Sequence, residues 1–171
     1  LAMNNNKIKI IKYADDTVVI GLIENNDETD YRNAIDFVSE WCSQNFLNLN
    51  VTKTKEVIPD FRRKKNYKEP VIIDGSPVSI VSEYKYLGCI TSEDLSWDAH
   101  IANQMKKANK RLYHVRCLRK LNVNHKIICL FYNSVVSSVL LYAVACWYNN
   151  STEKNKKDVS KLSKKVKKMI S

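Results

Sequence analysis

The sequence predicts an α+β fold, because strand patterns occupy its first part and helical patterns its second. Charged and apolar residues alternate at residues 7–10, and an apolar β-branched run covers residues 17–22, as is typical of paired strands. Apolar residues recur at helical spacing in residues 30–46 and again from Asp98 onward. The content of 44% hydrophobic and 27% charged residues is that of a folded protein.

The first predicted element is a hairpin whose strands flank the segment Tyr13-Ala14-Asp15-Asp16. Its tip therefore carries two adjacent carboxylates. A helix is expected next, from about Asp30 to about Phe46. Acidic residues at 27–30 precede its apolar series, where they suit the positive end of the helix dipole.

A small antiparallel sheet is predicted after this helix. Residues 71–73 and 78–81 read as a second hairpin around the Asp74-Gly75 turn. Tyr84–Ile90 alternates weakly and is interpreted as a third strand near that hairpin.

The second part of the chain is predicted to be helical. From Asp98, one face of a helix carries the apolar residues Ile101, Met105, Ala108, Leu112 and Val115. A second helix is expected from His125 to about Trp147, with Asn124 as its cap. Residues 150–171 form a basic, Lys-rich tail, in which four apolar residues share one face of a weak helix: Val159, Leu162, Val166 and Ile170.

The stretch 127–148 contains no charged residue and is long enough to raise the alternative of a membrane-associated protein. Four small polar residues favour a buried helix with a polar seam instead: Asn133, Ser134, Ser137 and Ser138. We therefore expect no membrane span.

Charge is unevenly distributed along the chain. The net charge is +10; residues 100–171 hold sixteen Lys and Arg against two acids, whereas residues 1–99 hold twelve against sixteen. A basic half favours a polyanionic partner such as nucleic acid, although a solvated Lys-rich surface has the same composition.

Five cysteines form no Cys-x-x-Cys pair, and no secretory leader precedes them. This pattern predicts buried free thiols in an intracellular, nuclear or cytoplasmic protein that is not secreted. A zinc site built from two helical pairs, His114 with Cys117 and His125 with Cys129, is an alternative to plain core packing of these side chains.

Asp15 and Asp16 are the candidate metal ligands, because Mg²⁺ prefers oxygen ligands and leaves room for substrate phosphates. Taken alone, an Asp-Asp pair is more often an ordinary solvated turn. The order of several other segments adds to this reading: Glu40-Trp41-Cys42, Leu47-Asn48-Leu49-Asn50, Lys53-Thr54-Lys55, Tyr84-Lys85-Tyr86-Leu87-Gly88, Leu95-Ser96-Trp97-Asp98 with His100-Ile101, and Leu140-Leu141-Tyr142 to Trp147.

Together with Tyr13-Ala14-Asp15-Asp16, these segments resemble the C-terminal palm and thumb of a non-LTR retrotransposon (LINE-type) reverse transcriptase. The resemblance covers residues 7–148. It implies two-metal nucleotidyl transfer in an RNA-directed DNA polymerase, with Mg²⁺ as cofactor and an RNA template and DNA primer, or their duplex, as partners. Residues 1–97 would be a partial palm with the primer-grip-like segment, 98–149 a helical thumb-like region and 150–171 a basic tail.

The resemblance also implies residue roles. Asp15 and Asp16 would hold the catalytic metals, and Lys53, with Lys55 as its rival, would neutralise the departing pyrophosphate. Without the resemblance, both lysines read as a solvated strand edge. The primer would lie against Tyr13, Tyr86, Leu87 and Gly88. Phosphates of the duplex would meet Lys106, Lys107, Lys110, Arg111, Arg116 and Arg119.

The chain departs from this family at one point. The family's other metal-binding Asp lies on an upstream strand, and twelve residues precede Tyr13 here. We therefore expect the chain to be a fragment that is inactive alone, with the missing N-terminal part of the same polyprotein as a partner. The alternative is a noncatalytic nucleic-acid-binding module derived from a retroelement, whose salt-sensitive duplex binding survives Asp15→Ala.

Overall fold

The computed structural model describes residues 6–63 and 68–170, except for the side chains of residues 167, 169 and 170. The chain forms two compact units, and each is considered by itself. Unit 1 contains the described residues up to Ile58 and residues 68–81, and unit 2 contains residues 59–63 and those from Ser82 onward. The predicted segment 1–97 is thus divided between the two units. The secondary structure is mixed, with small sheets and helices.

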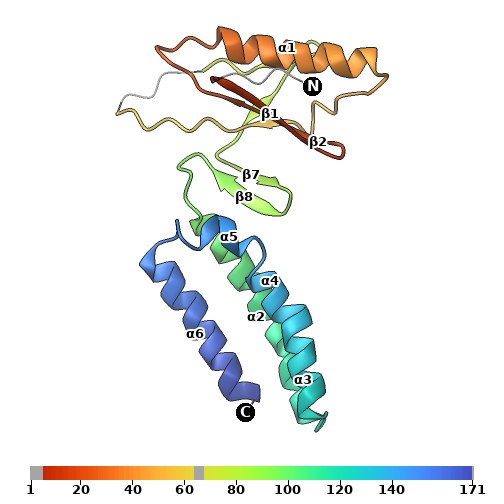
Figure 1. Ribbon diagram of the computed structural model, residues 1–171, viewed down its shortest axis with the longest axis vertical. Coiled ribbons are helices and arrows are strands. Elements are labelled where there is room, and N and C mark those ends of the chain that lie inside the picture. Colours follow the sequence, from red (N-terminus) through yellow and green to blue (C-terminus); the bar gives the residue numbers. More distant parts are fainter. Residues whose placement is uncertain (1–5, 64–67, 171) are drawn as a thin grey trace. The chain divides into compact units, whose positions relative to one another are not determined.

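Unit 1 begins with the predicted hairpin. Strand β1 (Ile8–Tyr13) pairs antiparallel with β2 (Asp16–Gly21), so this prediction is confirmed. One face of the hairpin packs on helix α1 (Thr29–Gln44), as Figure 1 shows. Their shared core consists of Ile8, Ile10, Ala34, Val38 and Cys42.

Helix α1 ends two residues earlier than predicted. The chain leaves the helix at Phe46, which has a φ of 57° and is 97% exposed. The Asn45 side chain donates a hydrogen bond to the Trp41 carbonyl at 2.8 Å. A polar side chain thus satisfies one of the last helical carbonyls, and Phe46 contributes nothing to the core.

The second hairpin of unit 1 is shorter than expected. Strand β4 (Ile72–Ile73) pairs antiparallel with β5 (Ser76–Pro77). The predicted strand 78–81 is wrong as an antiparallel partner, because β6 (Ser79–Ile80) pairs in parallel with β3 (Lys55–Glu56). The antiparallel pairing extends one residue past Pro77, where the Val78 N–H donates to the Val71 carbonyl at 2.8 Å, and the chain then pairs with β3, where the Val81 N–H donates to the Glu56 carbonyl at 2.9 Å.

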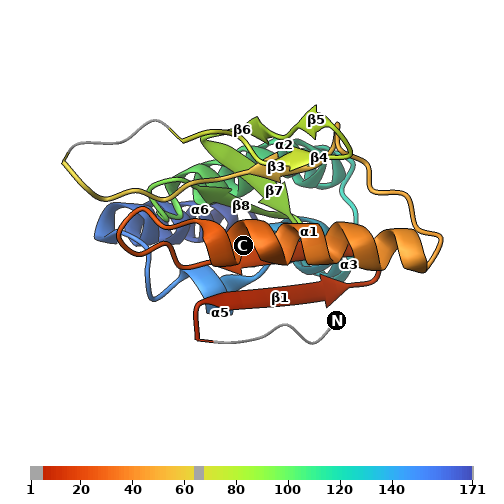
Figure 2. The ribbon, with the colours of Figure 1, turned by 90° about the horizontal axis from the view of Figure 1, so that it is seen from above.

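Helix α1 also packs on this second part of unit 1. Ile35 lies in a cluster with Val71, Ile73 and Val78. Figure 2 shows β1 on one side of α1 and the strands β3 to β6 on the other. Helix α1 is therefore the central element of unit 1.

A buried carboxylate joins α1 to β3. The Tyr31 hydroxyl donates a hydrogen bond to Oε1 of Glu56 at 3.0 Å, and Glu56 is 8% exposed. Burial raises the pKa of Glu56, although the bond from Tyr31 opposes the shift. The folded unit therefore holds this proton more tightly than the unfolded chain does, and ionisation of Glu56 destabilises the fold.

Replacing Glu56 by glutamine is expected to stabilise unit 1 increasingly as the pH rises. The destabilisation caused by ionised Glu56 is absent below the pKa of about 4.3 in the unfolded chain. It develops as the pH rises through the higher pKa of Glu56 in the folded unit. Urea unfolding at several pH values, followed through NMR signals of unit 1, measures the difference between variant and wild type. The control is Glu40→Gln, because Glu40 lies on α1 and is exposed. An equal pH dependence of stability in both variants would contradict the expectation.

Unit 2 begins with a hairpin of its own. The predicted strand 84–90 is wrong, because β7 (Glu83–Tyr86) turns back into β8 (Cys89–Ser92). Leu87 and Gly88 form the turn with φ values of 45° and 83°. Two successive positive φ angles reverse the chain within two residues, which a weak alternation pattern cannot reveal.

Helix α2 (Asp98–Lys120) is the long helix that the apolar spacing predicts. Its stripe is buried as expected at Ile101, Ala108, Leu112 and Val115, whereas Met105 is partly buried. Helix α3 (His125–Phe131) follows, and Oδ1 of Asn124 accepts a hydrogen bond from the Lys126 N–H at 2.9 Å. The predicted cap is confirmed.

The expected continuous helix to Trp147 is wrong. After α3 come a π-helical segment η1 (Tyr132–Ser137) and a short α4 (Ser138–Leu140). The chain then breaks at Ala143, which has a φ of 53°, before α5 (Val144–Trp147).

The predicted polar seam is wrong as well, because Asn133, Ser134 and Ser138 are exposed. Among the described residues, no helix is long and apolar enough to cross a membrane. The expectation of buried thiols holds for Cys42 but not for Cys146, which is exposed; all five cysteines are free.

The basic tail is a folded helix, α6 (Glu153–Ile170). Val159, Leu162 and Val166 are buried in the same core as the α2 stripe and Trp147. Three apolar residues at helical spacing therefore dock this segment despite its many lysines. The side chain of Ile170, expected on the same face, lies outside the described residues. Figure 1 shows α6 beside α2.

Candidate functional site

The hairpin tip of unit 1 presents two exposed carboxylates. Tyr13 pairs with Asp16, which leaves Ala14 and Asp15 as a two-residue loop, and Ala14 has a φ of 53°. Asp15 and Asp16 are both exposed. Within the described part of the chain, neither side chain forms a hydrogen bond or an ion pair, so both are available to a cation.

The tip is held by packing further down the hairpin. Ile8 and Ile10 are 3% and 7% exposed beneath α1. On the same face, the Lys12 ammonium lies 5.3 Å from the centre of the Trp41 ring. Side chains alternate along a strand, so Tyr13 and its partner Asp16 lie on the opposite, open face. Tyr13 is 64% exposed there.

This pair of carboxylates suits Mg²⁺, which is usually held by one or two protein carboxylates together with waters and substrate phosphates. Among residues 6–63 and 68–170, no group of three or more His, Cys, Asp or Glu could hold a metal ion. Asp15 and Asp16 thus supply part of a coordination shell.

Neither predicted lysine forms an ion pair with these carboxylates. Lys53 lies in an exposed turn, where its backbone N–H donates to Oδ1 of Asn50 at 3.1 Å. Nζ of Lys55 donates to Oγ of Ser79 at 3.2 Å. Lys55 is therefore engaged at the parallel β3–β6 pair.

The primer-grip-like segment forms the β7–β8 turn of unit 2. The Tyr142 hydroxyl donates a hydrogen bond to the Leu87 carbonyl at 2.6 Å. A Cβ added to Gly88 would lie 3.1 Å from Cε1 of Tyr142. Tyr86 is half-buried, and its hydroxyl has no partner among the described residues. Part of the backbone expected to meet a primer is thus already bonded to Tyr142.

The six predicted phosphate contacts on α2 do not share one environment. Lys106, Lys110, Arg116 and Arg119 are exposed, whereas Lys107 and Arg111 are half-buried. Nη1 of Arg111 donates a hydrogen bond to the Val135 carbonyl at 2.6 Å. Arg111 therefore ties α2 to the π-helical segment.

Of the two His–Cys pairs considered for a zinc site, one is close together in the structure. The Cys129 sulfur lies 3.7 Å from the His125 ring nitrogens. His114 and Cys117 do not join them, since no cluster of three metal-binding groups forms in the described ranges.

Comparison with known proteins gives one similarity over most of the chain. It is 27% identical over 146 residues to "RNA-directed DNA polymerase from mobile element jockey" of Drosophila funebris. The similarity supports a relationship to LINE-type reverse transcriptases. It covers 81% of this chain but 15% of the relative, so the chain spans a small part of that protein's length.

The reverse-transcriptase similarity includes residues of both units, because 146 residues exceed the length of either one. A family described as "Alkylated DNA repair protein alkB homolog 8, N-terminal" matches residues 97–138, less than half of the chain. No solved structure matches.

His100 and Tyr142 belong to longer segments singled out in the sequence, but neither of them is assigned a role of its own there. His100 is fully buried, and its Nδ1 accepts a hydrogen bond from the Ile90 N–H at 3.3 Å. Burial lowers the pKa of His100, which suits a neutral ring acting as acceptor. With Tyr142 it fastens the β7–β8 hairpin to the helices. The four-residue spacing of His100 and buried Gln104 beside the α2 stripe was the available signal.

Proposed function

We propose that this chain forms the carboxylate-bearing part of the palm and the thumb of a LINE-type reverse transcriptase. The observation that carries the proposal is the exposed Asp15-Asp16 tip on a hairpin anchored beneath α1. The similarity to the jockey polymerase makes RNA-directed DNA synthesis the favoured use of that tip. Because the chain spans a small part of that relative, the activity is proposed for a longer protein that contains it.

Asp15 and Asp16 would hold Mg²⁺ at the hairpin tip. The bound ions would activate the primer 3′ hydroxyl and stabilise the charge of the leaving pyrophosphate. Asp15, in the loop itself, is the better placed ligand, and Asp16 lies beside it on the open face with Tyr13. Tyr13 would contact the primer end through its exposed ring.

Other residues would bind and orient the nucleic acid. Lys53 is exposed and would neutralise negative charge on the departing group, with Lys55, whose Nζ donates to Oγ of Ser79, as its rival. The β7–β8 turn would support the primer strand at Gly88, whose lack of a side chain makes room for the Tyr142 ring that holds the turn in place. Four exposed cations of α2 would meet phosphates without reading bases: Lys106, Lys110, Arg116 and Arg119.

The proposal predicts a carboxylate-dependent metal site. Mn²⁺, as a paramagnetic probe for Mg²⁺, is expected to broaden the amide NMR signals of residues 13–17, and added Mg²⁺ to restore them. Asp15→Asn should weaken this binding by at least about tenfold. Asp36→Asn, an exposed carboxylate on α1, is the control and should leave the broadening unchanged.

The same two variants test function in the longer polymerase. Primer extension on an RNA template should be lost with Asp15→Asn and retained with Asp36→Asn. Broadening that Asp15→Asn does not reduce, or unchanged extension in that variant, would overturn the proposal.

A further inference from the structure

Helix α6 carries a continuous row of lysines on its solvent side, which we name the α6 lysine face. Its members recur every three or four residues, except for the adjacent Lys164 and Lys165, and all are exposed: Lys154, Lys157, Lys161, Lys164, Lys165 and Lys168. Residues with this spacing lie on one side of a helix. At 1.5 Å per residue the row is about 21 Å long.

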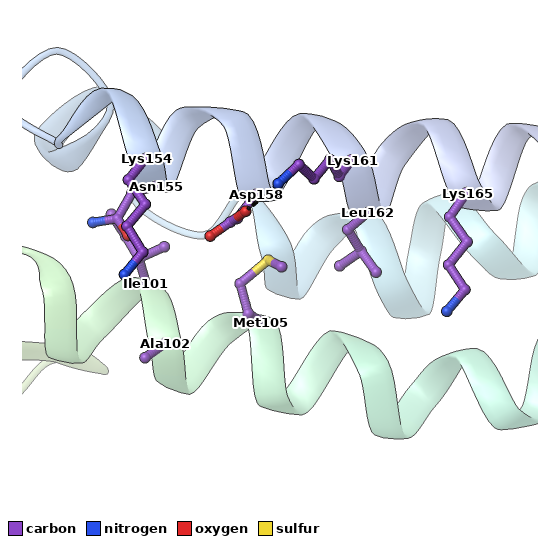
Figure 3. A pocket seen from close by; sticks show the side chains of 9 residues that line it. All are labelled: Ile101, Ala102, Met105, Lys154, Asn155, Asp158, Lys161, Leu162 and Lys165. Atoms are coloured by element: carbon purple, nitrogen blue, oxygen red, sulfur yellow. Dashed lines mark hydrogen bonds and ion pairs between the residues drawn. The ribbon is translucent and has the colours of Figure 1, made fainter.

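The orientation of this row is set by the core of unit 2. Val159, Leu162 and Val166 are 9%, 5% and 1% exposed and pack against the α2 stripe. These positions lie opposite the α6 lysine face on the helix. The row therefore lies away from the core, with Lys154, Lys161 and Lys165 on the side that faces α2 (Figure 3).

The charge of the row is not neutralised within the described part of the chain. The two acids of α6 each pair with one lysine, Glu153 with Lys156 at 3.0 Å and Asp158 with Lys161 at 3.1 Å. No described residue forms an ion pair with the other five lysines of the face. Like charges at this spacing repel each other by about 0.2–0.5 kcal/mol per pair.

The helix dipole does not account for the whole row. Lys164, Lys165 and Lys168 lie near the negative C-terminal end, where cations are favourable. Lys154 and Lys157 lie near the positive N-terminal end, where they are unfavourable. A partner that supplies negative charge along the full length of α6 would relieve both effects.

A groove borders the row on its α2 side. It has a volume of about 480 Å³ and an apolar floor formed by Ile101, Ala102, Met105 and Leu162. Figure 3 shows Lys154, Lys161 and Lys165 along its α6 wall. At one end, Nδ2 of Asn155 donates a hydrogen bond to Oδ1 of Asp98 at 2.6 Å.

We propose that the α6 lysine face binds the sugar-phosphate backbone of double-stranded nucleic acid, independent of base sequence. A duplex strand has one phosphate per about 3.4 Å of axis, so the row matches roughly six phosphates. Sugars of that backbone would lie against the apolar floor of the groove. The site is separate from Asp15 and Asp16 and does not depend on their proposed role.

An anionic membrane surface fits this helix less well. A helix that lies in a membrane buries its apolar face in lipid. In α6 that face is already occupied by the core of unit 2. A duplex strand, by contrast, supplies negative charge at regular intervals along the whole length of the row.

The test compares variants of the full chain that lose the same charge. In all three variants glutamine replaces three cations. The α6 variant changes Lys157, Lys164 and Lys168, and the control changes the exposed Lys9, Lys120 and Lys126. A third variant changes Lys106, Lys110 and Arg116 on α2. Lysine and glutamine have similar helix propensities, so helix content measured by circular dichroism should be retained.

Binding to DNA and RNA duplexes of two unrelated sequences is measured by fluorescence anisotropy at several salt concentrations. The plot of log affinity against log salt has a negative slope, and the α6 variant should make it shallower by about 2–3, since each lost phosphate contact contributes about 0.9. The control variant should make the slope shallower by less than about 1. The protein should bind the two unrelated duplex sequences with equal affinity.

Three results would overturn the proposal. One is a loss in the α6 variant no larger than in the control. Another is a salt dependence that becomes shallower in the α2 variant but not in the α6 variant, which would place the phosphate contacts on α2. The third is binding to phosphatidylserine vesicles without binding to either duplex.

Discussion

Replacing Trp147 by alanine is expected to lower the free energy of unfolding of unit 2 by about 3–5 kcal/mol. Trp147 is 1% exposed and lies in one core with Leu140 and the α2 stripe. Its Nε1 donates a hydrogen bond to the Tyr142 carbonyl at 2.9 Å, and its ring centre lies 6.5 Å from that of His100. Alanine would leave a cavity and an unpaired carbonyl.

Urea unfolding followed by far-UV circular dichroism measures this loss, because unit 2 contains most of the helix. Tyr148→Ala is the matched control, since Tyr148 is the next residue and is 47% exposed. It should cost no more than about 1 kcal/mol. Equal losses in the two variants would show that Trp147 is not a core residue.

Gly21→Ala is expected to destabilise unit 1 by about 1–3 kcal/mol. A Cβ at Gly21 would lie 2.7 Å from Cδ2 of Tyr31 and 3.0 Å from its Cβ and Cγ. The ring has little freedom to move aside, because its hydroxyl bonds to Glu56. Relief of the overlap would therefore disturb the joint between α1 and β3.

Amide hydrogen exchange of the β1–β2 pairs reports this effect locally. In a Tyr31→Ala background most of the overlap is gone, so Gly21→Ala should cost less there than in the wild type. The same cost in both backgrounds would mean that the ring is not the source of the strain.

The elements that sequence reasoning predicted well are those whose apolar pattern also forms the core. Ile8 and Ile10 alternate with lysines, and the same two residues anchor β1 beneath α1. The α2 stripe likewise spans a whole helix, so its period and bounds could be read directly. The exposed carboxylate tip followed from the strands on either side.

The errors arose where backbone geometry or a distant partner decides the structure. Leu87 and Ala143 adopt positive φ without being glycine, so nothing in their residue type marks a turn or a break. Helix α6 is dominated by lysine, and its three buried apolar residues dock on the α2 stripe, a partner that lies far away in the chain. The bond from Tyr142 to Leu87 joins residues far apart in the chain.

The π-helical segment has a consequence for comparing this chain with its relatives. A π turn inserted in an α-helix holds one residue more than the regular helix of the same length. Arg111, which donates to the Val135 carbonyl, binds within this widened turn. A relative that lacks one residue between Tyr132 and Ser137 can therefore keep the register of α4 and of Trp147. A gap of one residue at this place in an alignment would therefore mark a regular α-helical turn. The core of unit 2 would be intact, but the carbonyl that accepts the hydrogen bond from Arg111 would be lost.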